Sequence, residues 1–376
     1  MSIIIGADIV STQPNNELFA NGESKKLIGE DLNSIILKAD FRIFNLEAPL
    51  SNLRNPIKKD GSHLLSPTSS IHGMKALNIN LFTLANNHIM DHNSSGLFST
   101  IELLDEAGIK HIGAGENIHV ASKPFYINIH GKRYGIYACA EHEFSIADEQ
   151  KPGANPFDAL ESPDHVSQMK SQCDYAIVLY HGGKELYRYP SPMLQKTCRK
   201  LVEKGADLVV CQHSHCIGCK EDYLHGTIIY GQGNFLFNKK KNEFWDTGVL
   251  IQLNDDNSIT YIPYRQQGNG IRISSEDDGN KILADFEKRS NEIQQTGFID
   301  RKYKEFAKKE ISDYVIFFLG LRYCKLYRIM NRISGQRLSP YLVEKTLRKN
   351  GLRLYNYIQC EAHRELILKG LRHENE

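Results

Sequence analysis

The chain has 376 residues, of which 41% are hydrophobic, enough to bury the core of one large or two ordinary domains. Its 46 Lys and Arg residues almost balance its 45 Asp and Glu residues, so the formal net charge at pH 7 is only +1. This even balance argues against a surface that neutralises many phosphates, and we expect no nucleic-acid partner.

The N-terminal sequence "MSIIIGADIV" has no basic region and only three consecutive isoleucines, too few for a signal peptide or a membrane span. The longest apolar run, "YVIFFLGL" at residues 314–321, is also too short to cross a bilayer. Eight cysteines are scattered without the spacing of a disulfide scaffold, which favours a reducing compartment. We therefore predict a cytoplasmic protein without a transmembrane segment.

Short β-branched runs alternate with longer helical stretches from residue 1 to about residue 264, which predicts a layered α/β fold with mostly buried strands. The predicted strands are Ile3–Val10, Phe41–Leu46, Asn80–Ala85, Ile109–Gly113, Pro124–Ile129, Arg133–Ala138, Asp174–Tyr180, Asp207–Cys211, Thr227–Tyr230, Gly248–Leu253 and Ser258–Pro263. The predicted helices are Leu27–Ala39, Ser94–Ala107 and Pro192–Lys204. A glycine follows each of the last two, as helix C-termini favour.

The composition changes after about residue 265. The polar, glycine- and serine-rich stretch "QQGNGIRISSEDDGN" predicts a linker and connecting helix over 266–298. This segment would join a domain at 1–265 to a basic helical extension at 299–376. Residues 300–376 hold 17 Lys and Arg against 9 Asp and Glu, whereas the rest of the chain holds 29 against 36. The two parts therefore differ in electrostatic character.

Two helices are predicted in this extension, at Ile311–Ile333 and Pro340–Gly370. The first has a broad apolar face, made of Tyr314, Phe317, Phe318, Leu321, Tyr323, Leu326, Tyr327 and Met330. Cations lie beside it at Arg322, Lys325, Arg328 and Arg332. We expect first that this face packs as a helical cap. The alternatives are a homo-oligomer interface and a peripheral contact with anionic lipid, which would make the protein membrane-peripheral.

Coordinating side chains recur where the predicted strands end. These residues are Asp8, Glu47, Asn87, His181 and His213, with His215 two residues further on. Because α/β sheets build their sites at this edge, five strands would deliver the side chains to one rim. Two carboxylates, a carboxamide oxygen and three imidazoles form a mixed O/N ligand set, which suits Mn²⁺, Fe or Zn²⁺ rather than Ca²⁺. We predict a site for one or two divalent metal ions.

The order of these blocks resembles the signature of the calcineurin-like metallophosphatases. More closely, a set of segments over about residues 2–237 resembles the CapA family of capsule and poly-γ-glutamate biosynthesis proteins. The segments are "GADIV", "FNLEAPLS", "TLANNHIMDHNSSGLFSTIELLDEAGIKHIGAG", "LYHGGKE", "KGADLVVCQHSHC" and "IIYGQGNFLF". The resemblance implies an α/β fold, a four-layer α-β-β-α metallophosphatase-like sandwich. It does not cover the helical extension.

Carried over residue by residue, the resemblance implies two metal positions that share Glu47. The first is held by Glu47, Asn87, His181 and His213, and the second by Asp8, Glu47 and His215. Val10 stands where ordinary metallophosphatases have a histidine ligand, so the second ion would bind more weakly, be a harder metal, or be absent. His88 would protonate the leaving oxygen, and Asp91 would orient His88.

The resemblance implies a metal-dependent hydrolase, first of all a phosphoesterase, in capsule, exopolymer or cell-envelope polymer synthesis. Amide or ester hydrolysis is also compatible with such a site. Lys184, Glu185 and Arg188 are candidates for contact with a phosphoester or an anionic polymer, although a solvated loop also explains them. Asn234 is implied to lie near the site. The alternative is a non-catalytic scaffold that holds an anionic polymer such as poly-γ-glutamate for a synthase.

Overall fold

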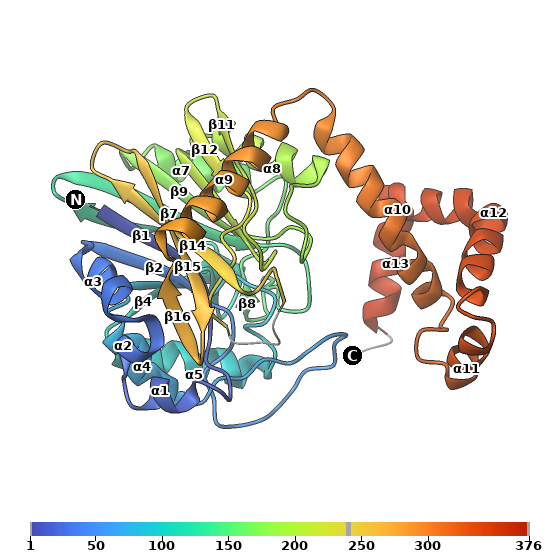
Figure 1. Cartoon of the computed structure of the whole chain (residues 1–376), viewed down its shortest axis with the longest axis horizontal. Helices are drawn as coiled ribbons and strands as arrows, with labels where there is room; N and C mark the ends of the chain where they lie inside the picture. Colours follow the sequence, from blue (N-terminus) through green and yellow to red (C-terminus); the bar gives the residue numbers. More distant parts are fainter. Residues whose placement is uncertain (1, 238–241, 374–376) are drawn as a thin grey trace. The chain divides into compact units, whose positions relative to one another are not determined.

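The computed structural model describes residues 2–237 and 242–373 (Figure 1). It divides the chain into two compact units, Met1–Ile299 and Asp300–Glu376. Some residues of the predicted domains lie outside the described residues, namely 1, 238–241 and 374–376. All strands named below belong to the first unit.

The first sheet has eight strands, in the order β16-β15-β14-β1-β2-β3-β4, with β13 paired to β1. In chain order these strands are β1 (Ser2–Val10), β2 (Phe41–Leu46), β3 (Leu81–Thr83), β4 (Lys110–Ile112), β13 (Asn234–Phe237), β14 (Thr247–Asn254), β15 (Ile259–Gln267) and β16 (Gly270–Ile273). The strands β1 to β4 run parallel, so their carboxyl ends meet at one edge of the sheet.

The second sheet has six strands, in the order β11-β12-β10-β9-β7-β6. These are β6 (Phe125–Ile129), β7 (Lys132–Ala140), β9 (Tyr175–His181), β10 (Leu208–Gln212), β11 (Lys220–Tyr223) and β12 (Gly226–Ile229). A small third sheet joins β5 (Ala114–Gly115) to β8 (Gly153–Ala154). The central strands β7, β9, β10 and β12 are parallel, and they too end at a common edge.

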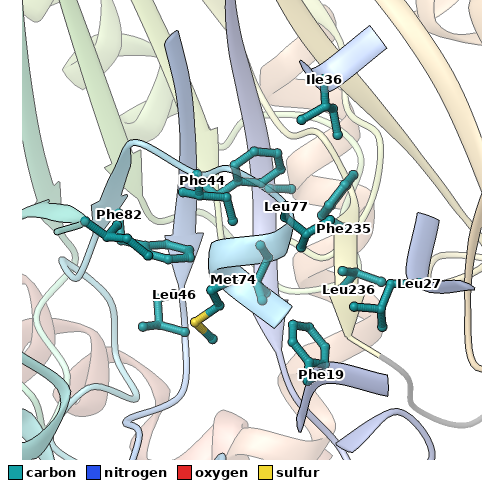
Figure 2. Packing of buried hydrophobic residues seen from close by; sticks show 14 of the residues in the cluster. Phe19, Leu27, Ile36, Phe44, Leu46, Met74, Leu77, Phe82, Phe235 and Leu236 are labelled. Atoms are coloured by element: carbon teal, nitrogen blue, oxygen red, sulfur yellow. The ribbon is translucent and has the colours of Figure 1, made fainter. Parts of the chain in front are cut away.

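Alternate residues of the strands separate two hydrophobic cores. Ile3 and Ile43 of the first sheet pack against Ile177 and Val210 of the second, which fills the space between the sheets. Residues on the opposite face of the first sheet, such as Phe44, pack against helices instead. Figure 2 shows this outer core, which gathers Phe19, Leu27, Ile36, Phe44, Leu46, Met74, Leu77, Phe82, Phe235 and Leu236.

Helices cover the outer face of each sheet. The first sheet is covered by α1 (Asn16–Ala20), α2 (Ser24–Ile28), α3 (Glu30–Lys38), α4 (Ile71–Ala76) and α5 (Asn93–Glu106). The second is covered by α7 (Ser162–Lys170) and α8 (Pro192–Glu203). Short helical turns η1 (Thr68–Ser70) and α6 (Ile118–Ala121) lie in the connections. The layers thus follow the order helix, sheet, sheet, helix, and the predicted four-layer α-β-β-α sandwich is confirmed.

The segment predicted as a linker and connecting helix has a definite place in the first unit. It contains β16 and α9 (Glu276–Glu292), and α9 lies across β15 (Figure 1). Phe286 of α9 is buried against Tyr261 of β15, with ring centroids 4.9 Å apart. The hydroxyl of Ser275 begins the helix by accepting a hydrogen bond from Asp278 N.

Several predicted helices are divided by local breaks. The predicted helix Leu27–Ala39 is split into α2 and α3 at Gly29, whose φ of 78° is incompatible with a continuous helix. The extension contains four helices, α10 (Phe298–Phe318), α11 (Lys325–Ile333), α12 (Leu338–Gln359) and α13 (Glu361–His373). The prediction of one continuous helix over Ile311–Ile333 is therefore wrong, because the chain leaves the helical conformation at Gly320, where φ is 68°. Likewise, the extended backbone of Cys360 interrupts the predicted helix Pro340–Gly370.

The second unit has a small core of its own, formed by Val315, Ile316, Tyr327 and Val343. Tyr327 is the buried member of the apolar face predicted for this region, whereas Phe318, Tyr323, Leu326 and Met330 are exposed. Within residues 2–237 and 242–373, none of the helices combines the length and the apolar composition needed to span a bilayer.

Candidate metal centre

The predicted ligands are brought to one place by the parallel strands of the two sheets. Asp8 lies near the end of β1, Glu47 directly follows β2, and Asn87 follows β3. His181 is the last residue of β9, and His213 directly follows β10. These five residues and His215 are all buried. The carboxyl ends of strands from both sheets therefore enclose a polar site within an otherwise apolar sandwich.

Two overlapping groups of side chains could each hold a metal ion. One consists of Glu47, His181 and His213, and the other of Asp8, Glu47 and His215. Within each group, the candidate ligand atoms all lie within 4.8 Å of one another. Glu47 belongs to both groups, so its carboxylate lies where it could bridge two ions. The family resemblance implies the same three residues for the second group and adds Asn87 to the first.

The first group surrounds His181 Nε2. This atom lies 3.1 Å from Asn87 Oδ1, 3.2 Å from His213 Nδ1 and 3.9 Å from Glu47 Oε1. The Asn87 amide is oriented by Glu143, because Asn87 Nδ2 donates a hydrogen bond to Glu143 Oε2 at 3.1 Å. Asn87 Oδ1 is thereby left facing the imidazoles, as a ligand oxygen must be.

The second group surrounds His215. His215 Nε2 lies 3.9 Å from Glu47 Oε1, and His215 Nδ1 lies 3.5 Å from Asp8 Oδ2 and 2.8 Å from Asn234 Oδ1. Asp8 Oδ2 is buried and accepts no hydrogen bond from any described residue. A buried carboxylate oxygen in this condition is costly in free energy unless a cation compensates it. The second group therefore fits a divalent ion.

The pKa values of the three imidazoles fall into two classes. Burial holds the pKa of His181 well below its usual value, and the neighbouring His213 and His215 reinforce the shift. Burial and the neighbouring His215 also lower the pKa of His213. These two imidazoles are therefore neutral at pH 7, the state that binds a metal.

Burial alone would lower the pKa of His215 as well, but the carboxylates of Glu47 and Asp8 raise it to about 9. The second group is thus a position that attracts positive charge strongly. A bound divalent ion would replace the proton of His215 there. The donor set and its electrostatics both fit a metal centre.

The backbone near the site is strained where it presents two of the imidazoles. His213 and His215 have φ values of 83° and 54°, in the left-handed region that non-glycine residues seldom adopt. Trp245 stacks on the His215 ring at a centroid distance of 4.5 Å and fixes its orientation. Backbone strain at two adjacent candidate ligands is typical of a functional site.

Two hydrogen-bonded asparagines, Asn45 and Asn86, support the candidate ligand Asp8. Asn45 Nδ2 donates to Asp8 Oδ1 at 2.8 Å, and Asn86 Nδ2 donates to Asn45 Oδ1 at 3.1 Å. Asn86 Oδ1 in turn accepts a hydrogen bond from His88 N at 3.1 Å. The sequence analysis missed Asn45 and Asn86, although a polar residue inside the buried strand sequence "FRIFNL" is a usable signal for the first of them.

His88 and Asp91 contact each other as predicted from the resemblance, and a third residue joins them. His88 Nδ1 lies 2.6 Å from Asp91 Oδ2. Lys59 Nζ forms an ion pair with Asp91 Oδ1 and lies 3.2 Å from His88 Nδ1. Burial acts to raise the pKa of Asp91, but hydrogen bonds from His88 and Lys59 outweigh it and lower the pKa. Asp91 is therefore an anion compensated by Lys59.

The predicted substrate residues differ in their positions. Asn234 directly contacts His215, whereas Lys184 and Glu185 are exposed. Arg188 Nη1 donates to Ile217 O at 3.0 Å, and its guanidinium lies over the Phe244 ring. Arg188 also lines a pocket of about 370 Å³. The sequence analysis missed Glu143, which lies in a loop rich in acidic residues and therefore gives no distinguishing signal.

Comparison with known proteins places the sandwich in a family. Residues 3–239 match the family described as Bacterial capsule synthesis protein PGA_cap. The capsule biosynthesis protein CapA of Bacillus anthracis is 28% identical over 257 residues, which cover 65% of this chain and 62% of that relative. The PGA biosynthesis protein CapA of Bacillus subtilis is 27% identical over 220 residues, covering 57% and 58%. The chain thus spans less than two thirds of the length of these curated relatives.

Two solved structures resemble this chain at low sequence identity. A phosphatase from Mycoplasma pneumoniae is 13% identical with a TM-score of 0.43, and the match covers 70% of this chain and 92% of that one. A NAD nucleotidase from Haemophilus influenzae is 13% identical with a TM-score of 0.42, covering 77% and 56%. The match to the capsule synthesis family ends at residue 239, before the second unit begins.

Proposed function

The chain belongs to the Bacterial capsule synthesis protein PGA_cap family, and we propose that it is a metal-dependent hydrolase of the phosphoesterase type. The observation that carries this proposal is the pair of buried ligand groups that share Glu47. The names of the relatives, which refer to capsule and PGA biosynthesis, support a role in the synthesis of capsule or another envelope polymer.

Two sets of residues would hold the metal, for which we propose Mn, Fe or Zn because the ligands are mixed O and N donors. The first set is Glu47, Asn87, His181 and His213, and the second is Asp8, Glu47 and His215. Divalent ions at these positions would supply Lewis-acid chemistry, which lowers the pKa of water and offsets negative charge on a phosphoryl group. The chain itself contributes the neutral imidazoles and the bridging carboxylate.

His88 is the proposed general acid. Its Nδ1 lies at hydrogen-bond distance from the ionised Asp91, so Nδ1 donates its proton in a hydrogen bond to that carboxylate and Nε2 remains for the substrate. The proton on Nε2 could then pass to the leaving oxygen of the substrate. Asp91 acts by holding the ring in place, and Lys59 keeps Asp91 ionised and fixed.

One observation favours the alternative of a non-catalytic scaffold for an anionic polymer. Val10, which stands in the place of a histidine ligand, is buried with Ala48, Phe237 and Trp245 and can offer no donor atom. The second metal position therefore has few protein ligands. A site that has lost catalysis could still hold carboxylates or phosphates through a single ion.

Metal content and turnover decide between the two functions. Purified protein supplied with Mn²⁺ should bind at least one ion and hydrolyse a generic phosphoester such as p-nitrophenyl phosphate. His213→Ala removes a ligand of the first set, so it should lower the metal content and abolish hydrolysis. His119→Ala is the matched control, because His119 is exposed and pairs with the exposed Glu149. Full metal binding without any hydrolysis of phosphoesters, esters or amides would favour the scaffold.

A further inference from the structure

The helix α11 exposes a continuous apolar stripe. Leu326 is 66% exposed, Ile329 56%, Met330 49% and Ile333 81%. These residues are spaced three, four and seven positions from the first, so they share one face of the helix. Phe318 and Tyr323, which precede the helix, are exposed as well. A grouped apolar surface of this kind is uncommon in water and indicates a contact surface.

The orientation of this stripe is fixed by another side of the same helix. Tyr327 of α11 is buried in the core of the second unit with Val315, Ile316 and Val343. Its hydroxyl contacts the hydroxyl of Ser339 in α12. Turning the stripe inward would remove Tyr327 from this core. The exposure of Leu326, Ile329 and Ile333 is therefore built into the packing of the unit.

The segment that carries the stripe is rich in positive charge. Residues 314–360 contain nine Lys and Arg residues and a single acidic residue, Glu344. Lys325, Arg328 and Arg332 lie on α11 itself. Long basic side chains beside an apolar stripe can lay their stems along apolar surface and extend their charged ends to phosphate groups.

We propose that residues 318–333 form an interfacial membrane-binding surface that recognises anionic phospholipid. The apolar stripe would enter the boundary between headgroups and acyl chains, and the basic residues would contact lipid phosphates. A second copy of the chain fits this surface less well, because two such surfaces would bring like charges together. The inference rests on the second unit alone, and it does not depend on the proposed hydrolase activity.

Vesicle binding by the full chain tests the proposal. Wild-type protein should co-sediment with vesicles that contain phosphatidylglycerol and phosphatidylcholine, and bind weakly to phosphatidylcholine alone. Added salt should weaken the binding, because salt screens exposed charges. The double variant Arg328→Gln/Arg332→Gln should reduce affinity for the anionic vesicles by roughly 25-fold, since each basic residue contributes about fivefold.

A second double variant tests the apolar stripe. Ile329→Asp/Ile333→Asp should abolish co-sedimentation while leaving the circular dichroism spectrum unchanged, because both side chains are already exposed. Leu160→Asp is the matched control, since Leu160 in the first unit is 81% exposed, as Ile333 is. Failure of wild-type protein to bind anionic vesicles, or equal binding to both vesicle types, would overturn the proposal. So would a lipid-free dimer, detected by sedimentation, that Ile329→Asp/Ile333→Asp dissociates.

Discussion

Lys59 and Asp91 form an ion pair that is shielded from water on both sides. The Lys59 side chain is 3% exposed, and the Asp91 side chain is fully buried. Asp91 Oδ2 also accepts a hydrogen bond from Leu64 N at 2.6 Å, and Asp91 O accepts one from Ile57 N at 3.1 Å. The loop that carries Lys59 is thereby fixed to the turn that carries His88, the proposed general acid.

Replacing Lys59 by Met should lower the free energy of unfolding by about 3 kcal/mol, because Asp91 would keep its buried charge and lose its nearest cation. Urea denaturation at pH 7 measures this loss. Lys58→Met is the matched control, since Lys58 is the exposed neighbour and its replacement should change stability by less than about 0.5 kcal/mol. Equal stability of the two variants would show that the buried pair contributes nothing net.

The lowered pKa of Asp91 also predicts a pH dependence of stability. A carboxyl group whose pKa is lower in the folded state stabilises the fold above its unfolded pKa, near 4, and this contribution disappears as pH falls through the folded value. Asp91→Asn should therefore flatten the loss of stability as the pH falls below about 4. Asp255→Asn, at an exposed aspartate, should leave that loss almost unchanged. Identical acid profiles for wild type and Asp91→Asn would contradict the assignment.

The placement of the candidate ligands could be predicted because each follows a recognisable strand. The strand sequences before Glu47 and His213 are short, apolar and β-branched, and parallel strands bring their carboxyl ends to one edge. The resemblance of the sequence blocks supplied the division into two sets. The four-layer arrangement could be predicted for the same reasons.

Other parts of the site depend on tertiary contacts that leave no pattern in the sequence. Lys59 follows Lys58 in a polar loop. The ion pair with the distant Asp91 holds Lys59 in a buried position, whereas Lys58 is exposed. Glu143 is one of several acidic residues in its loop, and its contact with Asn87 distinguishes it. The break between α2 and α3 at Gly29 was missed because apolar periodicity continues through a single glycine.

His88→Gln separates catalysis from metal binding. The variant should lower kcat for phosphoester hydrolysis by roughly 10²–10⁴-fold, the usual contribution of a general acid, while the protein keeps its full metal content. Stopped assays with matched metal analysis measure both quantities. Retention of wild-type kcat would remove His88 from the mechanism. Loss of metal together with activity would place His88 among the ligands instead.

Removal of metal should destabilise the first unit. Ligands that bind only the folded protein raise the free energy of unfolding by about 2.7 kcal/mol when their concentration is 100 times Kd. Dialysis against a chelator should therefore lower the Tm, and added Mn²⁺ should restore it. The variant His213→Ala should show a much smaller response to Mn²⁺. A Tm that is the same with and without Mn²⁺ would argue against a metal at this site.

Anomalous scattering from crystals grown with Mn²⁺ tests the central claim most directly. We expect a peak among Glu47, Asn87, His181 and His213. A second and weaker peak is expected beside Asp8 and His215, because Val10 supplies no ligand there. Crystals of the His213→Ala variant should lose the first peak. The absence of any anomalous peak near Glu47 in wild-type crystals, with Mn²⁺ present in excess, would contradict the metal centre and the hydrolase function that depends on it.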